Sequence, residues 1–183
     1  MKPFFKSQFI VLVFSILFLF SCSSDLDFTQ TKNLLLEPIY VANLVYFDIP
    51  APEFVTNGVE TPQFIDRSTV DIFNNTFLVN DLAKVELDFE INNTIARAYT
   101  LDVKLFNASG IQIDTIAIAV PAYYGTANVI TQKEVFQGTR LATLKNTTRI
   151  EMTLRMAPGT ALTETSSGTI KMRSGITAYF VLQ

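Results

Sequence analysis

The sequence predicts an all-β protein, built as a single antiparallel β-sandwich of about seven or eight strands with one short helix. Two observations lead to this prediction. Apolar and charged side chains alternate with a period of two, most regularly over residues 85–91 and 150–156, as they do in strands that bury one face. Turn-forming residues separate such segments about every 8–12 residues, which is typical of sandwiches. Because each strand buries one face, two sheets must cover one another.

The first strand is predicted over Ile39–Ile49, which is rich in β-branched and aromatic residues. Residues 48–68 then contain three prolines, and proline cannot donate a hydrogen bond within a sheet. We therefore expect a long irregular connection there. The dipeptide Asn57-Gly58 is a type I′ turn signal and predicts a short hairpin inside this connection.

Three consecutive strands are predicted in the middle of the chain. The first begins at Val85 and the second at Tyr99, each with apolar side chains on one face and charged ones on the other. The turn Asn107–Gly110 should reverse the chain, with Gly110 supplying a positive φ. Residues 111–120 are more continuously apolar, which predicts a central strand or one covered on both faces.

The C-terminal part is predicted to add three strands and the helix. Leu141 and Leu144 lie at helical spacing after Gly138, which predicts a short helix over 139–146. Gly175 predicts a bulge in the last strand. The strands are expected at residues 128–136, 150–156 and 169–182.

The segment Lys84–Pro121 carries a resemblance to known sandwiches. An alternating strand ends in Asn92-Asn93, a second strand reaches a glycine turn at Gly110, and a third closes at Val120-Pro121. This pattern resembles bacterial immunoglobulin-like and LEA-type (WHy-like) domains. The resemblance implies an Ig-like strand arrangement, and it carries over no catalytic residue.

The N-terminus has the organisation of a secretion signal. Lys2 and Lys6 precede an apolar run over residues 9–20, interrupted only by Ser15. Twelve helical residues extend about 18 Å, which is too short for a hydrocarbon core about 30 Å thick. The sequence therefore predicts a signal-peptide helix rather than a transmembrane helix.

Leu19-Phe20-Ser21-Cys22 resembles the lipobox of bacterial lipoproteins, and Cys22 is the only cysteine of the chain. The resemblance implies cleavage between Ser21 and Cys22, a diacylglycerol thioether on the Cys22 sulfur, and acyl chains such as palmitate that hold the protein on a membrane. The alternative is an ordinary cleaved signal peptide followed by an incidental cysteine. The resulting division is a signal peptide at 1–21, an acylated flexible tether at 22–33 and one sandwich domain at 34–183.

The tether bears on the location of the protein. Asp25 and Asp27 resemble the acidic surface-export signal of Bacteroidota lipoproteins, although Leu26 separates them; the alternative is a solvated spacer. We expect an outer-membrane lipoprotein on the periplasmic face or at the cell surface. The oligomeric state stays open.

Composition excludes several functions. The chain has no histidine, no tryptophan and one cysteine, which excludes histidine-dependent triads, histidine metal sites, disulfides and thiolate cages. Without residues 1–21, 12 basic and 17 acidic residues remain, and a net charge of −5 gives no electrostatic reason to bind nucleic acid. We predict no enzyme activity and no cofactor.

Three candidate sites remain. Glu86, Asp88 and Glu90 form an outward row, and a direct pairing of the strands from Val85 and Tyr99 would set Asp88 against Asp102 as a weak calcium site. Charged outward rows are more often simply solvated.

Tyr123-Tyr124 is expected in a loop, where the rings could stack on a sugar or a protein partner, or else pack into the end of the sandwich. Asp114-Thr115-Ile116 matches the Bacteroidota O-glycosylation pattern at Thr115, a tripeptide that also arises by chance. The leading function is a non-enzymatic protein-interaction module in a cell-envelope assembly. A carbohydrate- or ligand-binding module is the alternative, and a hydrolase that uses carboxylates alone is a third class.

Overall fold

The computed structural model describes residues 35–70 and 76–182. Cys22, Ser21, the predicted signal peptide and the tether lie outside the described residues. The elements, in chain order, are β1 (Ile39–Pro50), the 3-10 helix η2 (Ala51–Phe54), β2 (Val55–Thr56), β3 (Val59–Glu60), β4 (Gln63–Thr69), α2 (Thr76–Asp81), β5 (Leu82–Asn93), β6 (Tyr99–Phe106), β7 (Gln112–Val120), β8 (Val129–Gln137), α3 (Thr139–Lys145), β9 (Arg149–Met156) and β10 (Thr169–Phe180).

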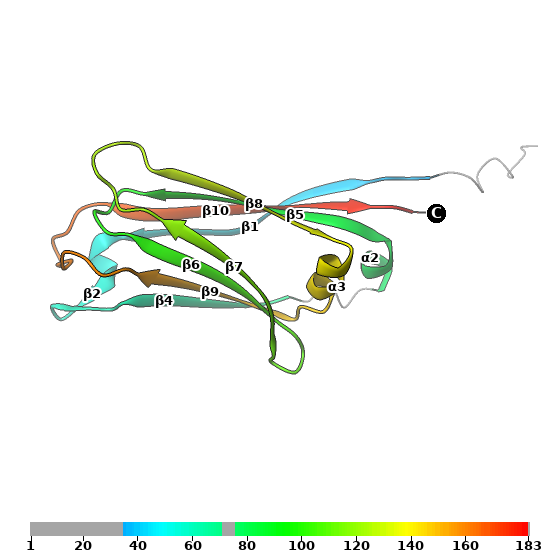
Figure 1. Cartoon of the computed structure of the whole chain (residues 1–183), viewed down its shortest axis with the longest axis horizontal. Coiled ribbons are helices and arrows are strands. Elements are labelled where there is room, and N and C mark those ends of the chain that lie inside the picture. Colours follow the sequence, from blue (N-terminus) through cyan, green and yellow to red (C-terminus); the bar gives the residue numbers. More distant parts are fainter. Residues whose placement is uncertain (1–34, 71–75, 183) are drawn as a thin grey trace, which may run out of the picture. The chain divides into compact units, whose positions relative to one another are not determined.

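The predicted all-β antiparallel sandwich is confirmed. Two four-stranded sheets lie face to face, one in the order β1-β10-β5-β8 and the other in the order β4-β9-β6-β7 (Figure 1). Between them lies one core of inward side chains, among which Tyr99, Leu101, Leu105, Phe136 and Ile170 are almost completely buried. The predicted hairpin at Asn57-Gly58 also forms, as β2 and β3, with both residues at positive φ.

The strand order differs from the immunoglobulin-like arrangement and is that of a jelly roll. Along the eight long strands the first pairs with the last, the second with the seventh, the third with the sixth and the fourth with the fifth. Only the pair β6–β7 joins neighbours in this series. Alternation indicates which face of a strand is buried and says nothing of its partner, so the sequence could not distinguish the two orders.

The connection between β5 and β6 is a corner between the two sheets, so the direct pairing that would have set Asp88 against Asp102 does not occur. The buried amide of Asn93 holds this corner. Its Nδ2 donates to the carbonyls of Arg97 and Pro121, both at 2.8 Å, and its Oδ1 accepts from the N–H of Ile95 at 3.0 Å. These bonds satisfy backbone groups that a strand would otherwise pair, and they turn the chain into the second sheet.

Two strands differ from their predicted roles. β4 lies inside the segment expected to be irregular, directly after Pro62; all of its residues are exposed, so it lacks the alternation that would have revealed it. β7 was expected to be central and is an edge strand. Its alanines at 117 and 119 face solvent, and counting them as apolar had suggested burial on both faces.

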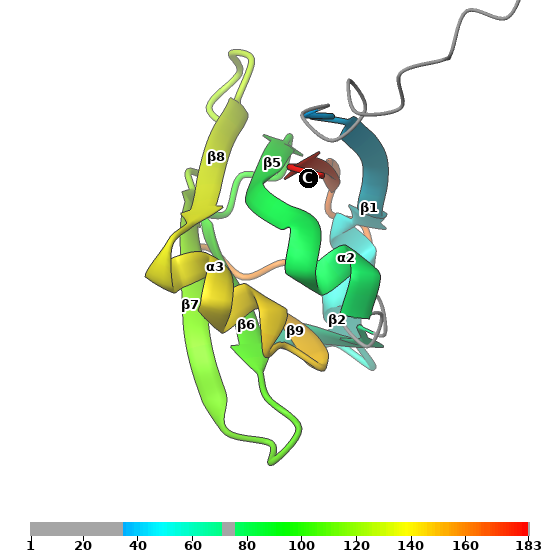
Figure 2. The same ribbon diagram turned by 90° about the vertical axis from the view of Figure 1, so that its right-hand side faces the viewer.

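The remaining local predictions are mostly confirmed. Helix α3 buries Leu141 and Leu144 and packs against β8 and β5 at the end of the molecule that faces the viewer in Figure 2. The bulge predicted at Gly175 of β10 lies instead in the partner strand β1, one position along: Leu44 and Val45 are both opposite Ser174, whose hydroxyl bonds to the N–H and carbonyl of Val45.

Candidate functional site

The free edge of β1 is the most distinctive surface of the described part of the chain. β1 is 12 residues long, and its residues 39–47 carry no charge. Several of its side chains are exposed, with Val41 at 76% and Tyr46 at 67%. An edge strand presents unpaired N–H and C=O groups, and a long apolar edge is therefore a template for another strand.

The other three edge strands are protected. β4 and β7 have 7 and 9 residues, with Asp66-Arg67 in β4 and Asp114 in β7. β8 has 9 residues, contains Lys133-Glu134, and is flanked by α3. Charges and short length are the usual devices that prevent edge pairing. β1 has the longest uncharged run of the four, nine residues (39–47) against six in β7 (115–120), although its bulge adds a local irregularity.

An apolar cleft opens beside β1. It has a volume of about 340 Å³ and lies between the two sheets, where β1 and β4 form their neighbouring edges. Leu44, Val45 and Ser68 border it, and side chains of the core form its interior: Leu87, Phe89, Val103, Leu105, Ile150 and Met152. A strand added to β1 could insert an apolar side chain here, as anchor residues do at protein interfaces.

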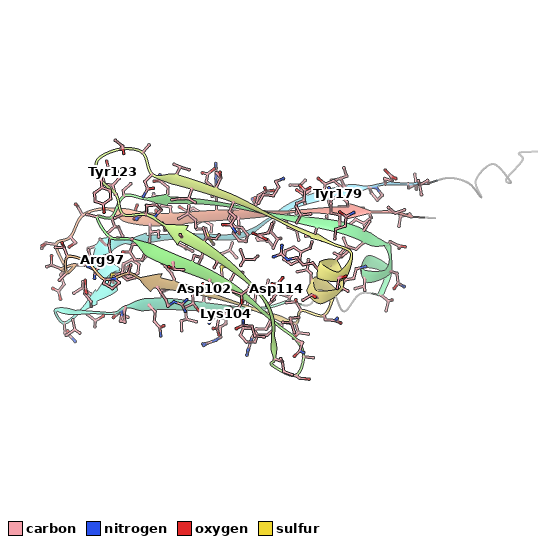
Figure 3. The ribbon with its side chains drawn as sticks, in the orientation of Figure 1. Arg97, Asp102, Lys104, Asp114, Tyr123 and Tyr179 are labelled. Carbon is pink, nitrogen blue, oxygen red and sulfur yellow. The ribbon has the colours of Figure 1, made fainter. Side chains whose placement is uncertain are left out.

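The structure separates the two aspartates of the candidate calcium site. Asp88 lies on β5, opposite Gly175 and Lys133, and its carboxylate is 3.4 Å from the Lys133 ammonium. Asp102 lies on β6 in the other sheet, is buried, and forms an ion pair with Arg155. The two residues therefore do not form the proposed calcium site. Figure 3 shows Asp102 and Lys104 on the same strand.

The row of acids on β5 is neutralised by cations. The hydrogen bonds from Lys133 and Lys84, at 2.8 and 2.9 Å, lower the pKa of Glu86 to about 2. In the other sheet, Arg67 at 2.7 Å lowers the pKa of Glu151, with Lys104 at 3.6 Å contributing less. A carboxylic acid that donates a proton in hydrolysis needs a raised pKa, so neither acid suits that role.

Tyr123 and Tyr124 occupy the loop after β7 and differ in exposure. The N–H of Tyr123 donates to the carbonyl of Ile95 at 2.9 Å and its side chain is partly buried, whereas Tyr124 is 86% exposed. Figure 3 shows Tyr123 at the same end as Arg97, remote from Tyr179. The structure thus favours packing for Tyr123 and leaves Tyr124 accessible.

Thr115 is exposed on the edge strand β7, where its hydroxyl accepts a hydrogen bond from Gln112 at 2.7 Å. Its N–H donates to Asp114, whose other carboxylate oxygen binds Arg140 at 3.1 Å. A glycosyltransferase could reach this position. Modification of Thr115 stays a prediction.

Sequence reasoning missed a partly buried ion pair at the loop end of the sandwich. Arg97 is 5% exposed and binds both oxygens of Glu60, at 3.1 and 3.0 Å, as well as the carbonyl of Thr160. Glu60 also accepts from the N–H of Leu162 at 2.7 Å. Beside it, burial raises the pKa of Tyr99. The only sequence signal for this ion pair was the single arginine in the segment Ile95–Tyr99. The cluster holds loops together and does not form a cavity.

Within residues 35–70 and 76–182, His, Cys, Asp and Glu side chains form no group of three or more that could hold a metal ion. Among the same residues, no helix is both long enough and apolar enough to cross a membrane.

No family model and no curated protein matches the chain. Solved structures that resemble it include the capsid of the Gx strain of infectious bursal disease virus, with 12% identity and a TM-score of 0.42 over 79% of this chain and 32% of that one. A candidate secreted protein from Parabacteroides distasonis has 12% identity and a TM-score of 0.42 over 63% of this chain and 36% of that one. Desmodium yellow mottle tymovirus has 10% identity and a TM-score of 0.34 over 81% of this chain and 90% of that one. The chain spans about a third of the first two proteins, and likenesses this distant carry no information on function.

Proposed function

We propose that this protein is an exported lipoprotein, held on the outer membrane through Cys22, that acts as a non-enzymatic interaction module in an envelope assembly. Its partner contributes a strand to the free edge of β1. The single observation that supports this proposal most is the run of nine uncharged residues, 39–47, on the longest edge strand.

Strand addition suits this surface on two counts. Main-chain hydrogen bonds to β1 would provide affinity without depending on the partner's sequence. The adjoining apolar cleft of about 340 Å³ would provide specificity by accepting a side chain from the added strand. The contact would not depend on the mildly negative charge of the chain, because residues 39–47 of the edge are uncharged.

Photo-crosslinking in intact cells tests the proposal. A photoreactive residue replaces Val41 on β1, and the control replaces Val129 on the edge strand β8, which is also exposed, at 52%. We expect a discrete adduct from position 41 and none from position 129. Adding Leu44→Lys, which places a charge at the mouth of the cleft, should abolish the adduct.

Mass spectrometry of the adduct identifies the strand that binds. A peptide from another protein supports the proposal, whereas a peptide from residues 23–34 or from a second copy of this chain would replace it with an intramolecular or a homomeric contact. Equal adducts from positions 41 and 129 would contradict it.

Carbohydrate binding through the loop of Tyr123 and Tyr124 is the second candidate, and the 86% exposure of Tyr124 favours it. Under this alternative, Tyr124→Ala should abolish retention on a polysaccharide column and leave the melting temperature unchanged. Tyr123→Ala should lower the melting temperature, because that ring is partly buried. Unchanged retention of Tyr124→Ala would eliminate the candidate.

A further inference from the structure

Gly175 occupies the middle of β10, a central strand, beside the bulge of β1, but its φ does not require glycine. It is absent from the residues with positive φ, unlike Gly110 or Gly168. A methyl group added at its Cα would meet only the carbonyl of Ala42 among the described residues, at an ordinary 3.6 Å. Glycine inside a strand is destabilising, and it often marks a place where a ligand approaches the backbone.

The missing side chain leaves a depression of about 370 Å³ on the outward face of the sheet β1-β10-β5-β8. In register, Gly175 has Asn43 on one side and Asp88 on the other, with Lys133 beyond Asp88. The neighbouring row across the same four strands consists of Tyr46, Arg173, Glu90 and Thr131. Hydrogen-bonding side chains thus surround a floor of bare backbone.

The charges of the depression are matched in pairs. Asp88 lies 3.4 Å from Lys133, which also binds Glu86 at 2.8 Å, and Glu90 lies 2.7 Å from Arg173. Because the acids and the cations balance, the depression offers little net attraction to a free cation or a free anion. A neutral ligand can instead accept hydrogen bonds from the cations and donate to the carboxylates while both pairs persist. The surface therefore favours a neutral molecule with several hydroxyl groups.

We propose that this depression binds a neutral saccharide. Its volume lies in the range of about 300–1,000 Å³ that is usual for small-molecule sites. The apolar face of a sugar ring would lie on the backbone at Gly175, while Asn43 and Asp88 reach neighbouring hydroxyls from either side. Tyr46, exposed at 67% and opposite Arg173, is placed to cover an adjoining ring.

This site is on the face of the sheet, so it does not depend on the strand addition proposed for the edge of β1, nor on Tyr124. Either proposal can therefore be refuted without affecting the other. The discriminating variant is Gly175→Thr, which places a side chain at the bottom of the depression and uses a residue type that favours strands. Ala119→Thr adds the same side chain to the outward face of the other sheet and serves as the control.

The experiment titrates the full chain, in detergent, with neutral oligosaccharides (maltopentaose, cellopentaose, xylopentaose and mannopentaose) and follows backbone amide shifts by NMR. We expect at least one of them to shift the amides of Gly175 and Asp88. Gly175→Thr should raise the Kd about tenfold or more, with an unchanged or higher melting temperature, whereas Ala119→Thr should bind as the wild type does. Inorganic phosphate and calcium should shift neither amide.

Absence of any shift at Gly175 across the four oligosaccharides would overturn the proposal. So would an unchanged Kd in Gly175→Thr, or a response to phosphate alone. If Gly175→Thr proves unstable, Asp88→Ala provides the second test, because this half-exposed side chain can be removed without disturbing the core. It should weaken binding, and unchanged affinity would likewise overturn the proposal.

Discussion

Replacement of Asn93 by alanine tests the corner that makes this sandwich a jelly roll. The side chain is fully buried and makes three hydrogen bonds to backbone groups, two in the connection between β5 and β6 and one at Pro121, which follows β7. The Pro121 carbonyl keeps another partner, because Asn128 also donates to it at 2.7 Å. Asn93→Ala therefore orphans two groups, the N–H of Ile95 and the carbonyl of Arg97.

An unsatisfied buried donor or acceptor costs about 1–3 kcal/mol. Two such groups predict a loss of about 3 kcal/mol in the free energy of unfolding, a large part of the total stability of about 5–15 kcal/mol that is usual for a domain. Asn93→Asp should cost at least as much, because a carboxylate oxygen would replace the amide that lies 2.8 Å from two carbonyl oxygens.

Asn92 provides a matched control. It precedes Asn93 on β5 and lies on the outward face, opposite Lys171 and Val129. Asn92→Ala should change stability by no more than about 0.5 kcal/mol. Urea denaturation of residues 22–183 carrying Cys22→Ser, followed by circular dichroism, measures all three variants. Equal stabilities of Asn92→Ala and Asn93→Ala would refute the buried corner. At a solvent-exposed hairpin turn, the two substitutions would change the free energy of unfolding by similar amounts.

Three further outcomes are expected. Cys22→Ser should release the protein from membranes into the soluble fraction on cell lysis, and continued sedimentation with membranes would contradict lipidation. The pKa of Glu86 is depressed from 4.5 to about 2, first by the hydrogen bond from Lys133 and then by that from Lys84, so its contribution to stability is present above pH 4.5 and is lost as the pH falls towards 2. The carboxyl carbon of Glu86, followed by NMR, should titrate near pH 2, and a midpoint near 4.5 would refute these ion pairs. Millimolar calcium should leave the melting temperature unchanged, because Asp88 and Asp102 lie in different sheets; a rise of several degrees would show a cation site that this geometry does not provide.

Local features of the fold were predictable wherever a strand buries one face. Apolar and polar residues alternate in the segments that form β5, β6 and β9, because the inward residues of these strands contact the opposite sheet. The helix is predicted by the helical spacing of Leu141 and Leu144. The pairing of β1 with β10 joins residues more than a hundred positions apart, and no local pattern encodes it. The jelly-roll order therefore required the structure.

The candidate surfaces were unpredictable for the same reason. An apolar run such as 39–47 has the same sequence pattern whether it becomes a buried central strand or an exposed edge. Only the sheet order shows that β1 is an edge strand. Asp102 was expected to face solvent because it alternates with apolar residues. It is buried because β6 is central and its outward face is covered by neighbours such as Arg155.

The exposed edge of β1 and the glycine in β10 are both costly for a protein that has no disulfide to stabilise it. A bare, uncharged edge invites pairing with any extended chain, and one lysine in β1 would prevent this. Alanine or threonine at position 175 would fit the backbone and strengthen the strand. Both features lie in the sheet β1-β10-β5-β8. Recognition at the two proposed contacts, the edge of β1 and the backbone at Gly175, would account for a loss of stability that packing alone does not explain.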